Sequence, residues 1–195
     1  MSVNLLFFAG SARTNSLNKK LAKAAAREAE SFGAHATFID LKDYPMPVYC
    51  GDLEEAEGVP QAAQELADIL RDQQGVFIAA PEYNSSITPL LKNTLDWVSR
   101  LRVAATPART PWHDKVYAVG ATSMGALGGI RVVQSMTGLL TNGYQVPVIP
   151  NTVAVARGHE VIGDAGEINS EPVAGMLRAA MKVLVETAGR QVERA

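Results

Sequence analysis

Apolar runs alternate with segments of helical periodicity along most of the chain. Residues 3–9 (VNLLFFA) and 75–80 (GVFIAA) are nearly all apolar, which is typical of strands buried on both faces of a sheet. Between such runs, apolar side chains recur every three or four positions, as on one face of a helix. This pattern predicts strands at 3–9, 36–39, 75–80, 115–121 and 145–149 and helices at 17–32, 59–70, 91–101, 127–140 and 173–192.

Residues with special backbone properties mark several element ends. Asn15 or Ser16 can cap the first helix, and Gly33 is expected to close it. Pro60 stands in the first turn of the second helix, where proline is tolerated. Pro147 interrupts the fifth predicted strand. Because proline cannot donate to a sheet ladder, it indicates an edge position or a bulge there.

The alternation of strands and helices also predicts the architecture. Such strands pair in parallel through right-handed crossovers, and helices cover both faces of the sheet. Segment 40–58 is expected to be a surface loop, and a loop through Thr106, Pro107 and Pro111 precedes the fourth strand. We therefore expect one α/β domain over residues 1–195, with a flavodoxin-like, doubly wound, three-layer arrangement and a five-stranded parallel sheet of order 2-1-3-4-5.

Composition narrows the classes of function. The net charge of -2, from 18 Lys and Arg against 20 Asp and Glu, disfavours a nucleic-acid partner, which usually requires a basic face. Residues 1–8 carry no basic leader and no apolar segment approaches the roughly 20 residues that cross a bilayer, so we expect a cytoplasmic protein with no membrane partner. Cys50 is the single cysteine and the three histidines lack ligand spacing, which disfavours a disulfide framework and a metal site.

Three polar loops follow predicted strands one, three and four. They cover residues 10–18, 81–86 and 122–129. In the expected strand order these three strands are neighbours, so their loops should converge where open parallel sheets bind ligands, outside the carboxyl ends of the strands.

The first loop, GSARTNSLN, has the groups that hold a phosphate. It offers backbone N–H groups at a helix N-terminus, the hydroxyls of Ser11, Thr14 and Ser16, the amide of Asn18 and the cation Arg13. The GxxxxGK[ST] and GxGxxG spacings are both absent, and the loop has no cysteine nucleophile, so holding phosphate is favoured over cleaving it. A well-capped helix with a surface arginine is the alternative.

The other two loops are less specific when each is considered alone. In PEYNSS, the ring of Tyr83 and several backbone amides could contact a planar heteroaromatic ligand, or Asn84 and Ser85 could simply form a turn. In TSMGALGG, the glycines allow close approach to a ligand or tight helix packing. Together, the three loops describe a site for a mononucleotide with a flat ring, and FMN fits that outline.

The segments GSARTNSLN, PEYNSSITPLLKNTLDW and TSMGALGGIR resemble, in order and spacing, the NADPH-dependent FMN reductase family. This resemblance runs from the first predicted strand to about Arg131, and it implies a flavodoxin-like FMN-binding domain. It implies that the FMN phosphate and ribityl chain are held by Ser11, Arg13, Ser16, Leu17 and Asn18. It implies that the isoalloxazine faces Pro81, Glu82, Tyr83 and Asn84, with Ser123 on the third side. Many family members have Pro-Gly where this sequence has Thr88-Pro89, so the turn into the third helix is expected to differ slightly.

The resemblance also implies an activity. NADPH or NADH would reduce bound FMN, and a small oxidant such as a quinone, free flavin, azo dye or metal oxyanion would then be reduced in a ping-pong sequence. The alternatives are a flavodoxin-like electron carrier, which the near-neutral charge disfavours, and a flavin-binding sensor. The residues leave the acceptor and the choice between NADPH and NADH open. A homodimer or homotetramer is implied, with Trp97 and Arg100 either at its surface or serving as ordinary core and solvated charge.

Overall fold

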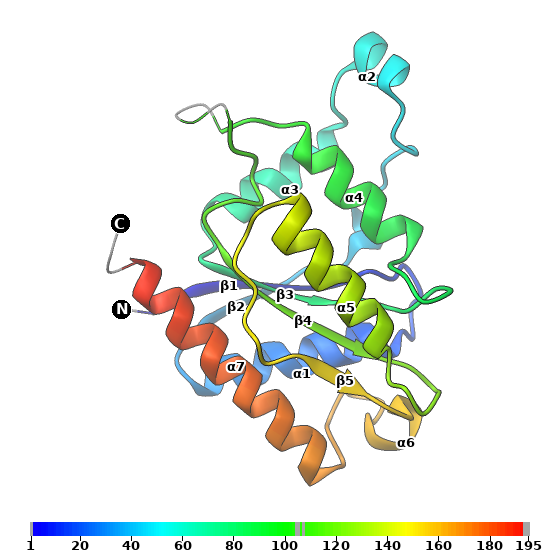
Figure 1. The fold of residues 1–195 in the computed structure, drawn as a ribbon, viewed down its shortest axis with the longest axis vertical. Coiled ribbons are helices and arrows are strands. Elements are labelled where there is room, and N and C mark those ends of the chain that lie inside the picture. Colours follow the sequence, from blue (N-terminus) through cyan, green and yellow to red (C-terminus); the bar gives the residue numbers. More distant parts are fainter. Residues whose placement is uncertain (1, 104–105, 107, 193–195) are drawn as a thin grey trace.

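A five-stranded parallel sheet runs through the centre of the molecule in the computed structural model, which describes residues 2–103, 106 and 108–192 (Figure 1). The strands are β1 (Asn4–Ala9), β2 (His35–Phe38), β3 (Gly75–Ala79), β4 (Val116–Thr122) and β5 (Val153–Val155). Their order is β2-β1-β3-β4-β5, and every neighbouring pair is parallel. The predicted fold class and strand order are therefore confirmed.

The central strands β1, β3 and β4 are buried on both faces, as the continuous apolar runs predicted. Alternate residues of β1 point to opposite sides: Leu5 and Phe7 belong to one apolar cluster, and Leu6 and Phe8 belong to the other. Two separate cores thus sandwich the sheet, which explains why its central strands carry so few polar residues.

Helices form the two outer layers. On one face lie α1 (Leu17–Ser31) and α7 (Glu171–Val192), and on the other lie α3 (Gln61–Arg71), α4 (Pro89–Ser99) and α5 (Ile130–Gly138) (Figure 1). Shorter elements are η1 (Leu41–Asp43), α2 (Gly51–Glu57), η2 (Leu139–Gly143) and α6 (Gly158–Val161). Within the described ranges, no helix combines the length and the apolar character needed to cross a membrane.

The end signals of α1 are confirmed. Of the two candidate caps, Ser16 is the N-cap, and its hydroxyl accepts a hydrogen bond from the Lys19 N–H. At the other end, Gly33 adopts a left-handed conformation with φ of +85° just beyond the helix.

The fifth strand lies later in the chain than the sequence predicted. Residues 145–149 meet β4 only through an isolated parallel bridge between Tyr117 and Val148, whereas β5 forms the ladder with the end of β4. Pro147 accepts a hydrogen bond from Tyr117 N–H through its carbonyl at 2.9 Å, but it has no N–H to return. The proline therefore limits this segment to a bridge, and the prediction of a strand there was wrong.

Two other predicted boundaries differ from the structure. Segment 40–58 is not only a loop, because it contains η1 and α2. The helix predicted from Leu127 begins at Ile130, since Gly128 and Gly129 have left-handed φ values of +61° and +82° that an α-helix excludes. It then passes into the π-helical turn η2.

The connection between α4 and β4 begins slightly earlier than predicted. The helix ends at Ser99, so Leu101 lies beyond it. The predicted loop through Thr106 and Pro111 is present, and Pro107 lies outside the described residues.

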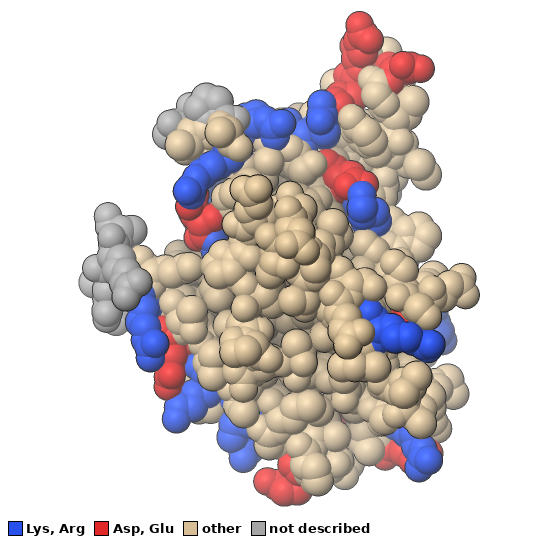
Figure 2. Space-filling model, in the orientation of Figure 1, with Lys and Arg blue, Asp and Glu red and all other residues tan. Residues whose placement is uncertain are grey.

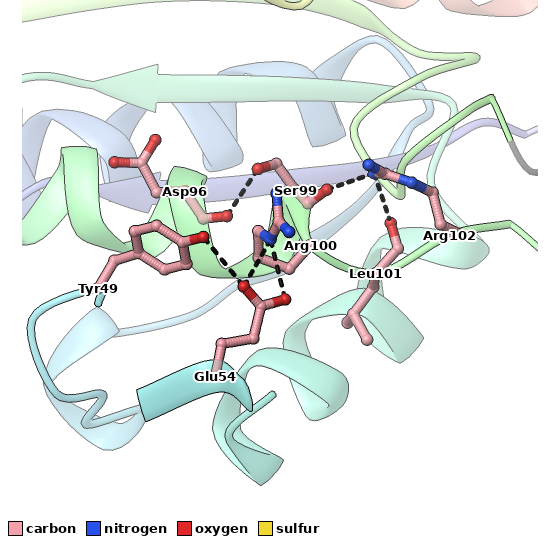
Figure 3. Close-up of polar contacts among 7 residues, drawn as sticks. All are labelled: Tyr49, Glu54, Asp96, Ser99, Arg100, Leu101 and Arg102. Carbon is pink, nitrogen blue, oxygen red and sulfur yellow. Dashed lines mark hydrogen bonds and ion pairs between the residues drawn. The ribbon is translucent and has the colours of Figure 1, made fainter. Parts of the chain in front are cut away.

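α2 stands away from the body of the fold (Figure 1), and contacts with α4 hold it there (Figure 3). Arg100 Nε donates to both carboxylate oxygens of Glu54 at 2.9 Å, and the Tyr49 hydroxyl donates to the same carboxylate at 2.9 Å. The Arg100 hydrogen bond lowers the pKa of Glu54, so the pair stays charged until the pH falls through that lowered value. Trp97 Nε1 donates to the Pro47 carbonyl at 2.7 Å, and its ring meets Tyr49 edge-on.

The burial of Trp97 decides between the two alternatives that the sequence left open for it. Trp97 is fully buried inside its own chain, so it is a core residue and cannot line a surface that a partner touches. Arg100 remains partly exposed, but its guanidinium is engaged by Glu54.

Candidate functional site

The loops that follow β1, β3 and β4 lie next to one another at the carboxyl edge of the sheet. They are the first loop (10–16), the second loop (80–88) and the third loop (123–129). The three strands are direct neighbours in the sheet. Thr88 also joins two of the loops, because its hydroxyl donates to the Gly10 carbonyl at 2.7 Å. The segments therefore meet at the edge where parallel sheets bind ligands.

The first loop presents unused backbone donors at the start of α1. Ser16 caps the helix through its side chain. Among the described residues, the N–H groups of Thr14, Asn15 and Leu17 have no hydrogen-bond acceptor. The first N–H groups of a helix carry partial positive charge and point outward, so they form a ready anion site.

Arg13 adds a full positive charge to these donors. Its side chain is exposed and forms no ion pair with any carboxylate of the described residues. The neighbouring Ser11 is buried, and its hydroxyl accepts a hydrogen bond from the Arg13 N–H at 3.3 Å. The loop thus combines a fixed hydroxyl, outward-pointing amides and a free guanidinium.

Asn18 connects this loop to the end of β4. Its side-chain Nδ2 donates to the Thr122 carbonyl, and its Oδ1 accepts from the Thr122 N–H, both at 3.0 Å. The residue is buried, and both ends of its amide are used in this contact. The structure therefore gives Asn18 a positioning role, in which it sets the start of α1 against the end of β4.

The second loop ends in a tight hairpin. The N–H of Tyr83 donates to the Ser86 carbonyl and the N–H of Ser86 donates to the Tyr83 carbonyl, both at 3.0 Å. The two residues between them, Asn84 and Ser85, have φ of +50° and +66°, which makes this a type I′ turn. Left-handed serine is uncommon, so the turn stores a small amount of strain while it presents Tyr83, which is 53% exposed.

Glu82 fixes this hairpin to α5. Its Oε1 accepts from Arg131 Nε at 2.9 Å, and its Oε2 accepts from the Val132 N–H at 3.3 Å. The N-cap of α5, Gly129, has no side chain to cap the helix, and the carboxylate of Glu82 takes that place near the positive end of the helix. Glu82 therefore faces α5, although the sequence placed it beside the ring of a ligand.

The third loop is tied to β5. Ser123 donates its backbone N–H to the Val155 carbonyl at 3.3 Å. A Cβ on Gly128 would lie 2.6 Å from the Ala156 nitrogen, and one on Gly129 would lie 2.7 Å from Ala121 Cβ. The sequence allowed the glycines of this loop to serve either close approach to a ligand or tight packing. Gly128 and Gly129 serve packing. By contrast, a Cβ on Gly125 would meet nothing closer than 3.8 Å.

Large apolar side chains are exposed on the second and third loops. Tyr83 is 53% exposed, Met124 is 67% exposed and Leu127 is 57% exposed. Exposed apolar side chains that lie together at a site can be covered by a ligand or a partner.

The structure thus brings together most of the residues that the sequence selected, and it adds two. Thr88, which links the first and second loops, and Arg131, which holds Glu82, were not predicted as site residues. The Thr88-Pro89 pair is a recognisable helix start, since Thr88 caps α4 and Pro89 is its first residue. No local signal pairs Arg131 with an acid 49 positions away.

Comparison with known proteins identifies the family. Residues 3–160 match the family model of the NADPH-dependent FMN reductases. The chain belongs to this family. The resemblance read from its three loop segments is therefore confirmed.

Several members and structures are similar to the chain. A quinone reductase of Pseudomonas putida strain KT2440 is 35% identical over 166 residues, which cover 83% of this chain and 82% of that protein. A quinone reductase of Escherichia coli K12 is 34% identical over 122 residues, which cover 63% of this chain but only 61% of that protein. Among solved structures, FerB, a flavoenzyme NAD(P)H:(acceptor) oxidoreductase from Paracoccus denitrificans, superposes with a TM-score of 0.78 at 25% identity, covering 97% of this chain and 98% of that chain.

Proposed function

We propose that this chain is an FMN-dependent NAD(P)H oxidoreductase that reduces a small oxidant such as a quinone. Membership of the FMN reductase family and the quinone reductases among its relatives support this proposal. When bound, FMN supplies the chemistry by accepting hydride from a reduced nicotinamide and passing electrons to an oxidant. The chain's own residues then have to bind the cofactor, orient it and leave one face accessible.

The observation that carries the proposal is the set of unused donors in the first loop. In our assignment the FMN phosphate binds the N–H groups of Thr14, Asn15 and Leu17, the hydroxyls of Ser11 and Ser16, and the guanidinium of Arg13. Leu17 begins α1 at this point, and Asn18 holds the start of the helix against β4. A dianionic phosphate suits this group of donors because the helix end and the arginine both favour negative charge.

In the same assignment the flavin ring lies beside the second and third loops, near Pro81, Tyr83, Asn84 and Ser123. Tyr83 contributes an exposed aromatic ring on a rigid turn. Glu82 acts indirectly, because its ion pair with Arg131 at 2.8 Å keeps that turn in place. Exposed Met124 and Leu127 would give the acceptor an apolar surface.

The test is whether the chain turns over NADPH. We expect the full chain, supplied with FMN, to lose its visible flavin absorbance on anaerobic addition of NADPH and to regain it on addition of benzoquinone. Initial rates at several quinone concentrations should give parallel double-reciprocal lines, as a ping-pong sequence requires. An electron carrier or a flavin-binding sensor would bind FMN in the same titration but show negligible NADPH oxidation, and that result would refute the reductase assignment while sparing the cofactor site.

We also propose that the chain assembles as a homodimer or homotetramer. Figure 2 shows that the middle of one face of the molecule carries no Lys, Arg, Asp or Glu, and α5 lies at the front of that face (Figure 1). A broad surface without charge favours association between copies, because charged side chains are depleted at the centre of subunit interfaces.

This assembly is testable by light scattering. The chain of 20.8 kDa should elute with two or four times that mass. Gln134→Lys, which places a charge at an exposed position of α5, should shift the mass toward 20.8 kDa, because desolvating an unpaired charge opposes association. The matched change Gln61→Lys, at an exposed position of α3, should leave the mass unaltered. A wild-type chain that stays at 20.8 kDa at all concentrations would exclude the assembly.

A further inference from the structure

A cavity lies at the opposite edge of the sheet from the three loops. The cavity has a volume of about 530 Å³ and lies between α3 and residues 101–103 and 110–115. Lys115, one of its lining residues, directly precedes β4, and Thr122 ends that strand. At about 3.3 Å per residue along the strand, the cavity is roughly 20 Å from the third loop. It is therefore separate from the proposed cofactor site.

Lys115 is the unusual residue of this cavity. It is only 5% exposed, and its ammonium donates one long hydrogen bond, at 3.4 Å, to the His113 carbonyl. Among the described residues, no carboxylate lies within ion-pair distance of its Nζ. Burial lowers the pKa of Lys115 to about 8, and the charge of Asp72 partly opposes that shift. A buried ammonium with so few acceptors is costly unless an anion joins it.

The charges around Lys115 leave a net positive lining. The two acids of the lining are already paired, Asp68 with Arg71 and Asp114 with Arg109. Arg102, which also lines the cavity, donates only to the carbonyls of Ser99 and Leu101 among the described residues (Figure 3). Its guanidinium has donors to spare for an anion.

The rest of the lining can accommodate an apolar group. Ala67 of α3 and Leu101, Val103 and Pro111 of the α4–β4 connection supply apolar surface. His113 accepts the Thr110 N–H at Nδ1, 3.0 Å away, which leaves its Nε2 to carry the proton in the neutral ring. The cavity thus combines cationic donors with an apolar wall in a volume suited to a ring-sized molecule.

We propose that this cavity binds a small organic carboxylate with an apolar body, whose carboxylate pairs with Lys115 and Arg102. A bare inorganic anion would leave the apolar wall in contact with water, and a neutral ring would leave the Lys115 ammonium without a counter-charge. The lining therefore favours a molecule that has both a negative charge and an apolar body. The site does not depend on the proposed reductase activity.

Benzoate is a suitable probe, with inorganic phosphate and benzamide as partial probes. In ¹⁵N NMR titrations of the full chain with FMN present, benzoate should shift the amide signals of Leu101, Val103 and Lys115 while the visible flavin spectrum stays constant. Inorganic phosphate, which lacks the ring, and benzamide, which lacks the charge, should each bind about tenfold more weakly or worse.

Two variants test the roles of the cations. Lys115→Met should weaken benzoate binding by about tenfold or more, since it removes a charged donor but keeps most of the length of the side chain. Arg102→Gln alters an exposed position, so it should fold normally and should also weaken binding. Lys182→Met, at a side chain 60% exposed on α7, should bind benzoate like the wild type. Equal affinity of the wild type and both cavity variants, or shifts confined to the three loops, would overturn the proposal.

Discussion

Replacing Arg13 by alanine is expected to weaken FMN binding by roughly ten- to 150-fold, because a hydrogen bond between charged groups contributes about 1.5–3 kcal/mol. Arg13 is exposed and has no acidic partner among the described residues, so its removal disturbs no internal ion pair. The chain should therefore keep its wild-type melting temperature in the absence of cofactor. Quenching of flavin fluorescence during titration of the apo chain gives the dissociation constant. Added salt should reduce the difference between variant and wild type.

Riboflavin provides the decisive control for this prediction, because it is FMN without the phosphate. If Arg13 contacts the phosphate, Arg13→Ala should leave riboflavin affinity unchanged and bring FMN affinity closer to it. Arg190→Ala removes the same charge from a side chain 70% exposed on α7 and should alter neither affinity. Loss of affinity for both flavins in Arg13→Ala would place Arg13 at the ring or in a structural role, and no loss for either would remove it from the site.

Strands inside the sheet were easier to predict from the sequence than the short strand at its edge. β1, β3 and β4 lie inside the sheet, and their unbroken apolar runs placed them to within a residue or two. β5 was missed because a three-residue strand is too short to show a pattern. Its two valines, Val153 and Val155, are buried in the core on the α1 and α7 side of the sheet, among residues distant in the sequence. The apolar run 145–149 was the more strand-like segment, but Pro147 restricts it to one bridge.

The candidate site shows a similar division between local and long-range information. The hydrogen-bond donors of the first loop that could bind a phosphate were predictable from residue type and loop position. Capping and helix-end effects act over only a few residues. Partners far apart in sequence were not foreseeable. The amide of Asn18 is used by Thr122, and the carboxylate of Glu82 is used by Arg131. Which polar group meets which depends on the assembled sheet and cannot be read from spacing.

Replacing Gly10 by alanine is expected to damage both stability and cofactor binding. A Cβ at this position would lie 2.9 Å from Leu91 Cβ and 3.2 Å from Pro81 Cδ, so α4 and the second loop would have to move away from the first. The Gly10 carbonyl, which accepts the Thr88 hydroxyl, would move with it. Overpacking of this kind costs about 1–3 kcal/mol in the free energy of unfolding. We expect a melting temperature lower by several degrees, and FMN affinity reduced by about tenfold, as when one hydrogen bond to a charged group is lost.

Two control variants separate local displacement of the loops from general loss of stability. Leu184→Ala removes a fully buried side chain whose Cδ1 lies near Gly75, at the amino end of β3, so it should lower stability by about 2–5 kcal/mol without changing FMN affinity at temperatures where the chain is folded. Gly175→Ala adds a methyl group inside α7 where nothing lies within 4 Å, and it should raise stability by about 0.5–1 kcal/mol. If Gly10→Ala lowers stability but binds FMN as tightly as Leu184→Ala does, then the spacing between the first and second loops does not control the site. The loops would then have to bind the cofactor independently of each other, contrary to the arrangement proposed above.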